Sequence, residues 1–215
     1  MVRQRKNIER RLENLRAEFE GLAGATVDTE WRGAVGNPTR LLIDLARVAD
    51  LIVTASPEGA SSGNVHRSTD LGSLILQAGR PVFVASTNLE NFRINKVLVG
   101  WKDTREARRA VTDAMPFLQM AREVRVITID SDATDETWNS LDDVVALLSC
   151  HGVKAQAEVF SEESDGGTIA DVAEAMHADL IISGACGHSR FREWILGGAT
   201  RSLLENDRLN RVMSN

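Results

Sequence analysis

The chain has 215 residues, of which 43% are hydrophobic and 26% charged, and this composition is typical of an ordinary globular protein with one or two domains. Its net charge of -6 argues against a protein whose main task is to hold nucleic acid, so we expect no nucleic-acid partner. No apolar run approaches the ~20 residues of a membrane-spanning helix, and no secretory signal follows the basic N-terminus. These features predict a cytoplasmic protein with no membrane partner.

The first half of the sequence alternates between helical and extended patterns. Apolar residues between Ile8 and Leu22 recur at steps of four and three, which predicts a helix with one apolar stripe. The elements predicted after it are a strand at 26–35, a helix from 38, a strand at 49–55, a loop at 57–68, a helix at 70–77 and a strand at 81–85.

The second half continues this alternation. The predicted elements are strands at 97–99, 124–129, 153–160 and 180–182, and helices at 104–121, 136–151 and 169–177. Their order predicts an α/β fold with Rossmann-like open parallel sheets, flanking helices and right-handed crossovers. The segment 206–215 has only three apolar side chains, so we expect no apolar final strand there.

One short motif occurs twice in the sequence. Ala49-Asp50-Leu51-Ile52 recurs 129 residues later as Ala178-Asp179-Leu180-Ile181, in each case after a helical pattern that contains an aspartate. We interpret this spacing as a tandem repeat of two modules, residues 1–88 and 93–215, with a linker between them.

Residues 178–204 combine a buried strand, a glycine-rich loop and a helix start. The strand is followed by Gly184 and Gly187, and Gly197 and Gly198 precede the helical pattern. A loop between a parallel strand and a helix start brings free backbone N–H groups and the positive end of a helix dipole to one place. This arrangement suits an anion such as a phosphate.

The spacing Gly184-x-x-Gly187, nine residues and Gly197 closely resembles the signature loop of the universal stress protein family. With the repeat, the resemblance covers nearly all of the chain, which is similar to a two-module member of that family. The resemblance implies that ATP or another adenine nucleotide binds to the second module. The site residues that it implies are Gly184, Gly187, His188, Ser189, Arg190, Gly197, Gly198, Ala199 and Thr200, with Lys102 and Asp103 from the turn after the strand at 97–99.

Two positions depart from the binding pattern of that family. Gly198 stands where ATP-binding members usually carry Ser or Thr, and Lys102 stands where they usually carry an acidic residue. Asp103 follows one place later, and we predict that it is the N-cap of the helix from Thr104. Both departures remove a side-chain contact to nucleotide, while the glycine spacing is intact.

Catalysis is not indicated by the polar residues of the chain. Cys186 and His188 flank Gly187, but no third residue stands ready to orient the imidazole. The two cysteines and four histidines show no metal-ligand spacing, and no general base for nucleotide hydrolysis is evident. We therefore predict no metal site, no catalytic residues and no enzyme, with weak nucleotide hydrolysis left open.

Two functions are open at this point. The first is a stress-response protein whose second module binds an adenine nucleotide and acts as a sensor or regulator. The alternative is an interaction or dimerisation module of the same fold that binds no nucleotide. A family module begins with a strand, a helix and a strand before the helix that is here 3–22, so we expect the first module to lack them. Missing strands leave unpaired edges, which predicts a homodimer or larger oligomer.

Overall fold

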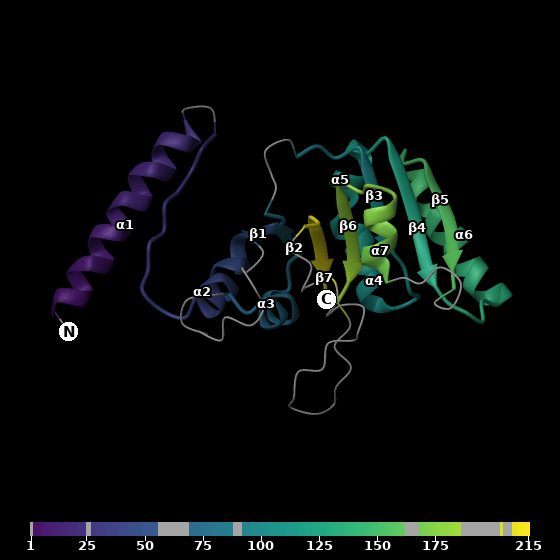
Figure 1. Ribbon diagram of the computed structural model, residues 1–215, viewed down its shortest axis with the longest axis horizontal. Coiled ribbons are helices and arrows are strands. Elements are labelled where there is room, and N and C mark those ends of the chain that lie inside the picture. The colour runs from purple at the N-terminus through teal and green to yellow at the C-terminus, as the bar shows by residue number, and fades with distance from the viewer. Residues whose placement is uncertain are drawn as a thin grey trace, which may run out of the picture. The chain divides into compact units, whose positions relative to one another are not determined.

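The computed structural model describes residues 2–24, 27–55, 69–87, 92–161, 168–185, 203 and 208–215. The chain divides into two compact units, Met1–Gly36 and Asn37–Asn215. The first contains helix α1 (Val2–Ala23), which confirms the helix predicted over residues 8–22, and the second contains the sheet (Figure 1). No helix in the described part of the chain combines the length and the apolar character that crossing a bilayer requires.

The second unit is organised around a seven-stranded sheet with the order β1-β2-β7-β6-β3-β4-β5. The strands are β1 (Ile52–Ala55), β2 (Val82–Ala85), β3 (Lys96–Gly100), β4 (Glu123–Ile129), β5 (Ala155–Phe160), β6 (Leu180–Gly184) and β7 (Arg211–Ser214). Among these strands, β2 and β7 pair antiparallel and every other neighbouring pair is parallel. The predicted α/β fold is confirmed. Strands from both predicted modules, 1–88 and 93–215, join in this sheet, and the module boundary stays a prediction.

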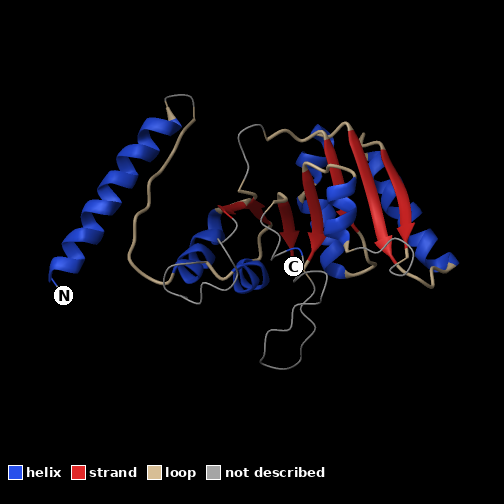
Figure 2. Ribbon diagram, viewed as in Figure 1, coloured by secondary structure: helices blue, strands red, loops and turns tan. Residues whose placement is uncertain are grey.

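Helices cover both faces of the sheet (Figure 2). The core on one face includes residues of α4 (Arg105–Asp113), α5 (Met115–Met120) and α6 (Asp135–Cys150). The other core includes α3 (Leu71–Ala78) and α7 (Ile169–Ala175), with α2 (Pro38–Leu45) and the 3-10 turn η1 (Ala46–Val48) packed on it. Side chains alternate between the two cores along the central strand β3, where Val97 and Val99 face one core and Leu98 faces the other.

Local signals in the sequence explain where the helices of the first half begin and end. Asn37 caps α2 by accepting a hydrogen bond from the Arg40 N–H at 3.0 Å, and Pro38 occupies the first turn. Asp70 caps α3, which ends at Gly79 with a positive φ of 62°. The helices predicted from 38 and at 70–77 are therefore confirmed.

Two predicted elements differ from the structure. Residues 27–36 form no strand, since Trp31 lies against Phe19 of α1 at a ring-centroid distance of 5.6 Å instead of pairing in a sheet. The helix predicted at 104–121 is two helices, because Pro116 lacks the N–H that a continuous helix would use and starts α5 after Ala114.

The segment 206–215 contains a strand, so our prediction of no apolar final strand is wrong. Strand β7 lies between β2 and β6, and its Val212 and Met213 are completely buried, one in each core. Arg211 is also completely buried, and its Nη1 donates to the Leu203 carbonyl at 2.6 Å. The strand was missed because it is only four residues long and two of its buried side chains are polar.

Candidate functional site

The sheet reverses its winding direction between β3 and β6. From β3 the chain passes to β4 and β5 on one side, whereas β6 and β7 lie on the other side of β3. Strands β3 and β6 are parallel neighbours, with Gly100 opposite Ser183 in the register. In open α/β sheets, ligands bind outside the carboxyl ends of strands at such a reversal. The structure therefore contains a candidate site at the carboxyl edge of β3 and β6.

Three of the predicted site residues lie at this edge. Gly184 is the last residue of β6, and Lys102 and Asp103 follow the end of β3. The others lie in the segment 186–202, outside the described residues. They are Gly187, His188, Ser189, Arg190, Gly197, Gly198, Ala199 and Thr200.

Gly184 is in backbone contact with the first turn of α4. A Cβ placed on it would lie 2.5 Å from the Ala107 nitrogen and 2.6 Å from the Glu106 carbonyl carbon. These are backbone atoms, which cannot move aside as the end of a side chain can. Helix packing alone therefore requires a glycine at the start of the predicted loop.

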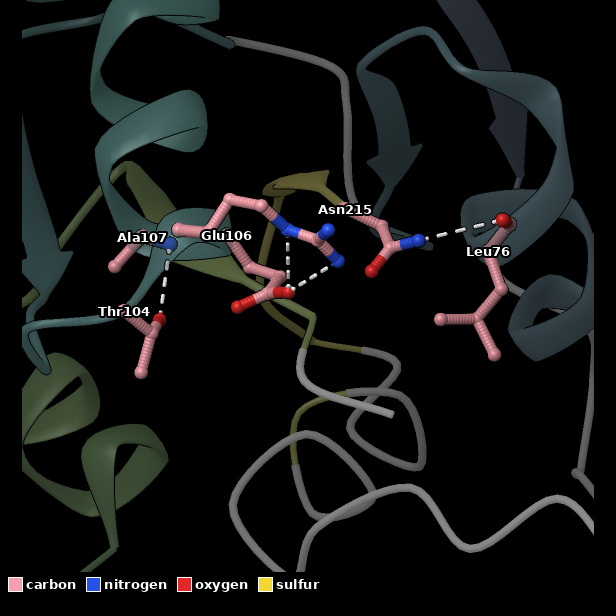
Figure 3. Close-up of polar contacts among 6 residues, drawn as sticks. Leu76, Thr104, Glu106, Ala107 and Asn215 are labelled. Carbon is pink, nitrogen blue, oxygen red and sulfur yellow. Dashed lines mark hydrogen bonds and ion pairs between the residues drawn. The ribbon is translucent and has the colours of Figure 1, made fainter. Parts of the chain in front are cut away.

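The N-cap of α4 is Thr104, so our prediction that Asp103 caps this helix is wrong. The Thr104 side chain accepts a hydrogen bond from the Ala107 N–H at 3.3 Å (Figure 3). Asp103 is exposed and accepts a hydrogen bond from Arg108 Nε at 2.9 Å. Both residue types are good caps, and the extended backbone of Thr104, with φ -129° and ψ 160°, decides between them.

Glu106 places a carboxylate beside the end of β6. Its Oε1 accepts from Arg105 Nη2 at 2.8 Å, and the Glu106 side chain is only 15% exposed (Figure 3). Burial raises the pKa of Glu106, but hydrogen bonds from its own backbone N–H and from Arg105 and Thr104, with the charge of Arg105, lower the pKa overall. The carboxylate is therefore charged at neutral pH and stabilised at a helix N-terminus. It makes this helix start unsuitable for a phosphate.

Lys102 supplies a positive charge at the edge. The residue is exposed, and its side-chain amino group has no hydrogen-bond or ion-pair partner among the residues that the structure describes. The preceding Trp101 is buried, with its Nε1 donating to Ser140 Oγ at 2.9 Å and its backbone N–H donating to the Ile127 carbonyl at 2.7 Å. A fixed backbone thus carries a lysine whose amino group can turn toward a ligand.

Two further polar residues lie at the carboxyl ends of neighbouring strands, and the sequence analysis missed both. Asn215 follows β7, and its Nδ2 donates to the Leu76 carbonyl of α3 at 3.3 Å (Figure 3). Asp130 follows β4, and its Oδ2 accepts from Thr137 Oγ1 at 3.1 Å. Asp130 had a recognisable signal, an acidic residue directly after a buried strand, whereas Asn215 could be found only once β7 was known.

Metal and thiol chemistry find no support in the described part of the chain. No three His, Cys, Asp or Glu side chains gather there in a way that could hold a metal ion. Cys150 is exposed at the end of α6, while Cys186 and His188 lie outside the described residues.

Known proteins match this chain in structure but not in sequence. No family model matches the sequence, and no curated protein matches it. Among solved structures, a universal stress protein from Archaeoglobus fulgidus superposes with a TM-score of 0.76 at 17% identity, covering 100% of this chain and 78% of that one. The chain has the universal stress protein fold. A protein of unknown function from Pseudomonas aeruginosa also matches, with a TM-score of 0.59 at 14% identity over 96% of this chain and 77% of its own length.

The universal stress protein fold accounts for the position of the glycine spacing in this chain. Gly184 ends β6 at the winding reversal, so the segment that carries the glycine spacing follows directly on the candidate site.

Proposed function

We propose that this chain is a cytoplasmic stress-response protein that binds an adenine nucleotide at the carboxyl edge of β3 and β6 and acts as a sensor or regulator, not as an efficient enzyme. The observation that carries the proposal is the winding reversal between β3 and β6, where β6 ends at Gly184, the first glycine of the predicted binding pattern. The universal stress protein fold of the neighbour from Archaeoglobus fulgidus supports the same assignment.

The phosphates of the nucleotide are assigned to the glycine-rich loop and not to α4. At the start of α4, the Thr104 side chain already accepts a hydrogen bond from a backbone N–H. The charged Glu106 offsets the positive end of the helix dipole there. In this proposal, the phosphates bind to backbone N–H groups of the glycines that follow Gly184 in sequence and to Arg190, and Lys102 adds a flexible charge from the neighbouring strand end.

Lys102 determines how the nucleotide is recognised in this proposal. A lysine has three donors and no acceptor, so it cannot take hydrogen bonds from ribose hydroxyls or from the adenine amino group. Recognition then depends more on phosphate charge than on the base. Binding should be weak, should discriminate poorly between ATP and GTP and should weaken as the salt concentration rises.

Calorimetry of the purified protein with ATP and GTP, at low and high salt, tests this proposal. Lys102→Met should weaken ATP binding by about tenfold at low salt and remove most of the salt dependence. Lys154→Met is the matched control, because Lys154 is exposed just before β5, at the opposite edge of the sheet. Equal losses in the two variants, or tight adenine-selective binding that salt does not affect, would contradict the proposed role of Lys102.

The alternative function is an interaction module of the same fold that binds no nucleotide. Three features favour it. The Thr104 side chain already accepts from a backbone N–H at the start of α4, Gly198 lacks a hydroxyl, and Lys102 lacks a carboxylate with which to contact a nucleotide. Mass spectrometry of the freshly purified, denatured protein separates the two functions. Co-purified ATP or AMP supports the sensor, whereas a nucleotide-free protein that also fails to bind ATP in calorimetry supports the interaction module. Release of inorganic phosphate at enzymatic rates would contradict both.

A further inference from the structure

Helix α1 has an apolar stripe that its own unit leaves largely uncovered. Ile8, Leu12, Leu15, Phe19 and Leu22 follow one another at steps of four and three. From residue 7 to the end of the helix, no side chain is buried, and Leu15 and Leu22 are 42% and 82% exposed. Helices in proteins owe most of their stability to packing of an apolar face. The stripe therefore needs a surface to pack on.

The segment after α1 lies against Phe19 of the stripe. Trp31 lies against Phe19 with an angle of 43° between the ring planes. Ile8 remains 41% exposed, and Leu12 is half-buried. All five side chains of the stripe, Phe19 included, thus stay exposed or half-buried, and we call them the seam.

The spacing of the seam is that of a coiled coil. Leu12 and Phe19 occupy the first core position of a heptad, and Ile8, Leu15 and Leu22 occupy the second. The positions that flank such a core carry the charges that choose partner and orientation. On one flank these are Arg11 and Glu18, and on the other they are Glu9 and Arg16.

We propose that α1 pairs antiparallel with α1 of a second copy of this chain, with Leu12 opposite the partner's Leu15 and Ile8 opposite the partner's Phe19. In an antiparallel pair, each flank meets the same flank of the other helix. Arg11 then meets the partner's Glu18, and Glu9 meets the partner's Arg16. By the twofold symmetry of the pair, every such contact occurs twice and joins opposite charges.

Arg16 can make this contact while keeping its partner within the helix. Its Nε donates to Glu20 Oε1 at 2.7 Å, one turn further along α1. A guanidinium has five N–H donors, so a second carboxylate can bind at its other edge.

The charges disfavour the other ways of pairing two copies of α1. In a parallel pair, each flank meets the opposite flank five residues further along, which places Arg11 against the partner's Arg16. Shifting the antiparallel pair by one heptad brings Arg11 against Arg11 or Glu18 against Glu18. Only the proposed register pairs opposite charges on both flanks.

Charge reversal measured by sedimentation equilibrium tests the pairing. Arg11→Glu should weaken the dimer by about tenfold, because two attractive contacts become repulsive. Arg11→Glu combined with Glu18→Arg should restore the affinity, since the pairs are attractive again. The control is Arg10→Glu, which makes the same charge change on the face away from the seam and should leave the affinity unchanged.

Cross-linking with a short bis-maleimide tests the orientation, using single cysteines in a Cys150→Ser, Cys186→Ser background. Ile8→Cys mixed with Phe19→Cys should give cross-linked heterodimers, whereas each variant alone should give few homodimers. Cross-linking of Ile8→Cys with itself would indicate a parallel pair and overturn the proposal.

Several outcomes of these experiments count against the pairing. A monomeric parent protein, a dimer that Arg11→Glu leaves unchanged, or equal effects of Arg10→Glu and Arg11→Glu would each overturn it. Far-ultraviolet circular dichroism and urea unfolding of every variant show whether the second unit is still folded. A loss of dimer in a folded variant is then attributable to α1.

Discussion

The motif Ala-Asp-Leu-Ile begins two strands that have different surroundings. Strand β6 lies between β3 and β7, whereas β1 lies at the end of the sheet with β2 as its one neighbour among the described strands. Ile182 of β6 is completely buried, while Val53, at the corresponding place in β1, is 64% exposed. Similar strand sequences thus give a central strand and an edge strand.

The aspartate of the motif shows the same difference. Asp179 Oδ2 accepts hydrogen bonds from the backbone N–H groups of Asn95 and Lys96, at 2.9 and 2.8 Å, and so fixes the start of β3 beside β6. Asp50 is exposed and makes no hydrogen bond among the described residues. The aspartate of the motif therefore fixes a neighbouring strand at β6 and has no such role at β1 among the described residues.

The largest expected contrast between the two strands concerns their apolar residues. Ile182→Ala should lower the free energy of unfolding by about 4 kcal/mol, because it leaves a cavity in a fully packed core. Val53→Ala removes a mostly exposed side chain and should change the free energy of unfolding by less than about 0.5 kcal/mol. Urea denaturation followed by circular dichroism measures both. Equal losses would mean that the edge of β1 is covered in solution.

The ends of β6 and β3 give the next contrast. Gly184→Ala should cost about 3 kcal/mol, because the new Cβ meets backbone atoms of α4 at 2.5 Å. Gly100→Ala should cost only about 1 kcal/mol, since its Cβ meets the Ile169 Cδ1 atom at 2.8 Å and that side chain can turn away. A smaller loss for Gly184→Ala than for Gly100→Ala would contradict the close contact of β6 with α4.

Removing the two aspartates compares the motif residues directly. Asp179→Ala leaves two partly buried N–H groups without their acceptor and should cost about 2 kcal/mol. Asp50→Ala should be neutral within about 0.5 kcal/mol. The same urea titrations test this, and a neutral Asp179→Ala would show that the start of β3 does not depend on the carboxylate.

The smallest contrast concerns the aspartates in the helices before the two strands. Asp171 accepts from the Thr168 N–H at 2.7 Å in a capping box, whereas Asp44 only pairs with exposed Arg47. Asp171→Asn should cost about 1 kcal/mol at neutral pH, and Asp44→Asn less than about 0.5 kcal/mol.

The capping contribution of Asp171 should depend on pH. Hydrogen bonds from the Thr168 backbone and side chain lower the pKa of Asp171. The stabilisation is therefore present above the ordinary carboxyl pKa and is lost as the pH falls through the lowered pKa of the folded state. Unfolding of the parent and of Asp171→Asn at a series of pH values should show their difference shrinking in acid. A constant difference would exclude the ionised carboxylate as its source.

Local signals allowed much of the fold to be predicted, and contacts between distant segments limited the rest. Asp70 is a typical residue before a helix and Gly79 a typical residue after one, so α3 could be predicted from its own sequence. Strand β7 has no such signal, because burial of Arg211 depends on the Leu203 carbonyl, which accepts its hydrogen bond. The number of apolar residues in the segment 206–215 therefore could not predict the strand.

The candidate site likewise contains residues that could be predicted from the sequence and residues that could not. The sequence placed Lys102 and Gly184 at the carboxyl ends of strands, and both lie there. It assigned the helix cap to Asp103 instead of Thr104, since neighbouring residues were equally suitable in sequence. Glu106 was missed because its burial depends on the contact between α4 and the end of β6.

The position of β7 in the sheet has a consequence for biosynthesis. Of the described strands, the one that leaves the ribosome last stands between β2 and β6 and joins them. Until it emerges, a nascent chain holds two strands whose inner edges lack the partner that they have in the finished protein. Exposed strand edges are sites of misassociation. We therefore expect chaperones to hold this chain during synthesis, and its sheet to close only after translation has passed residue 214.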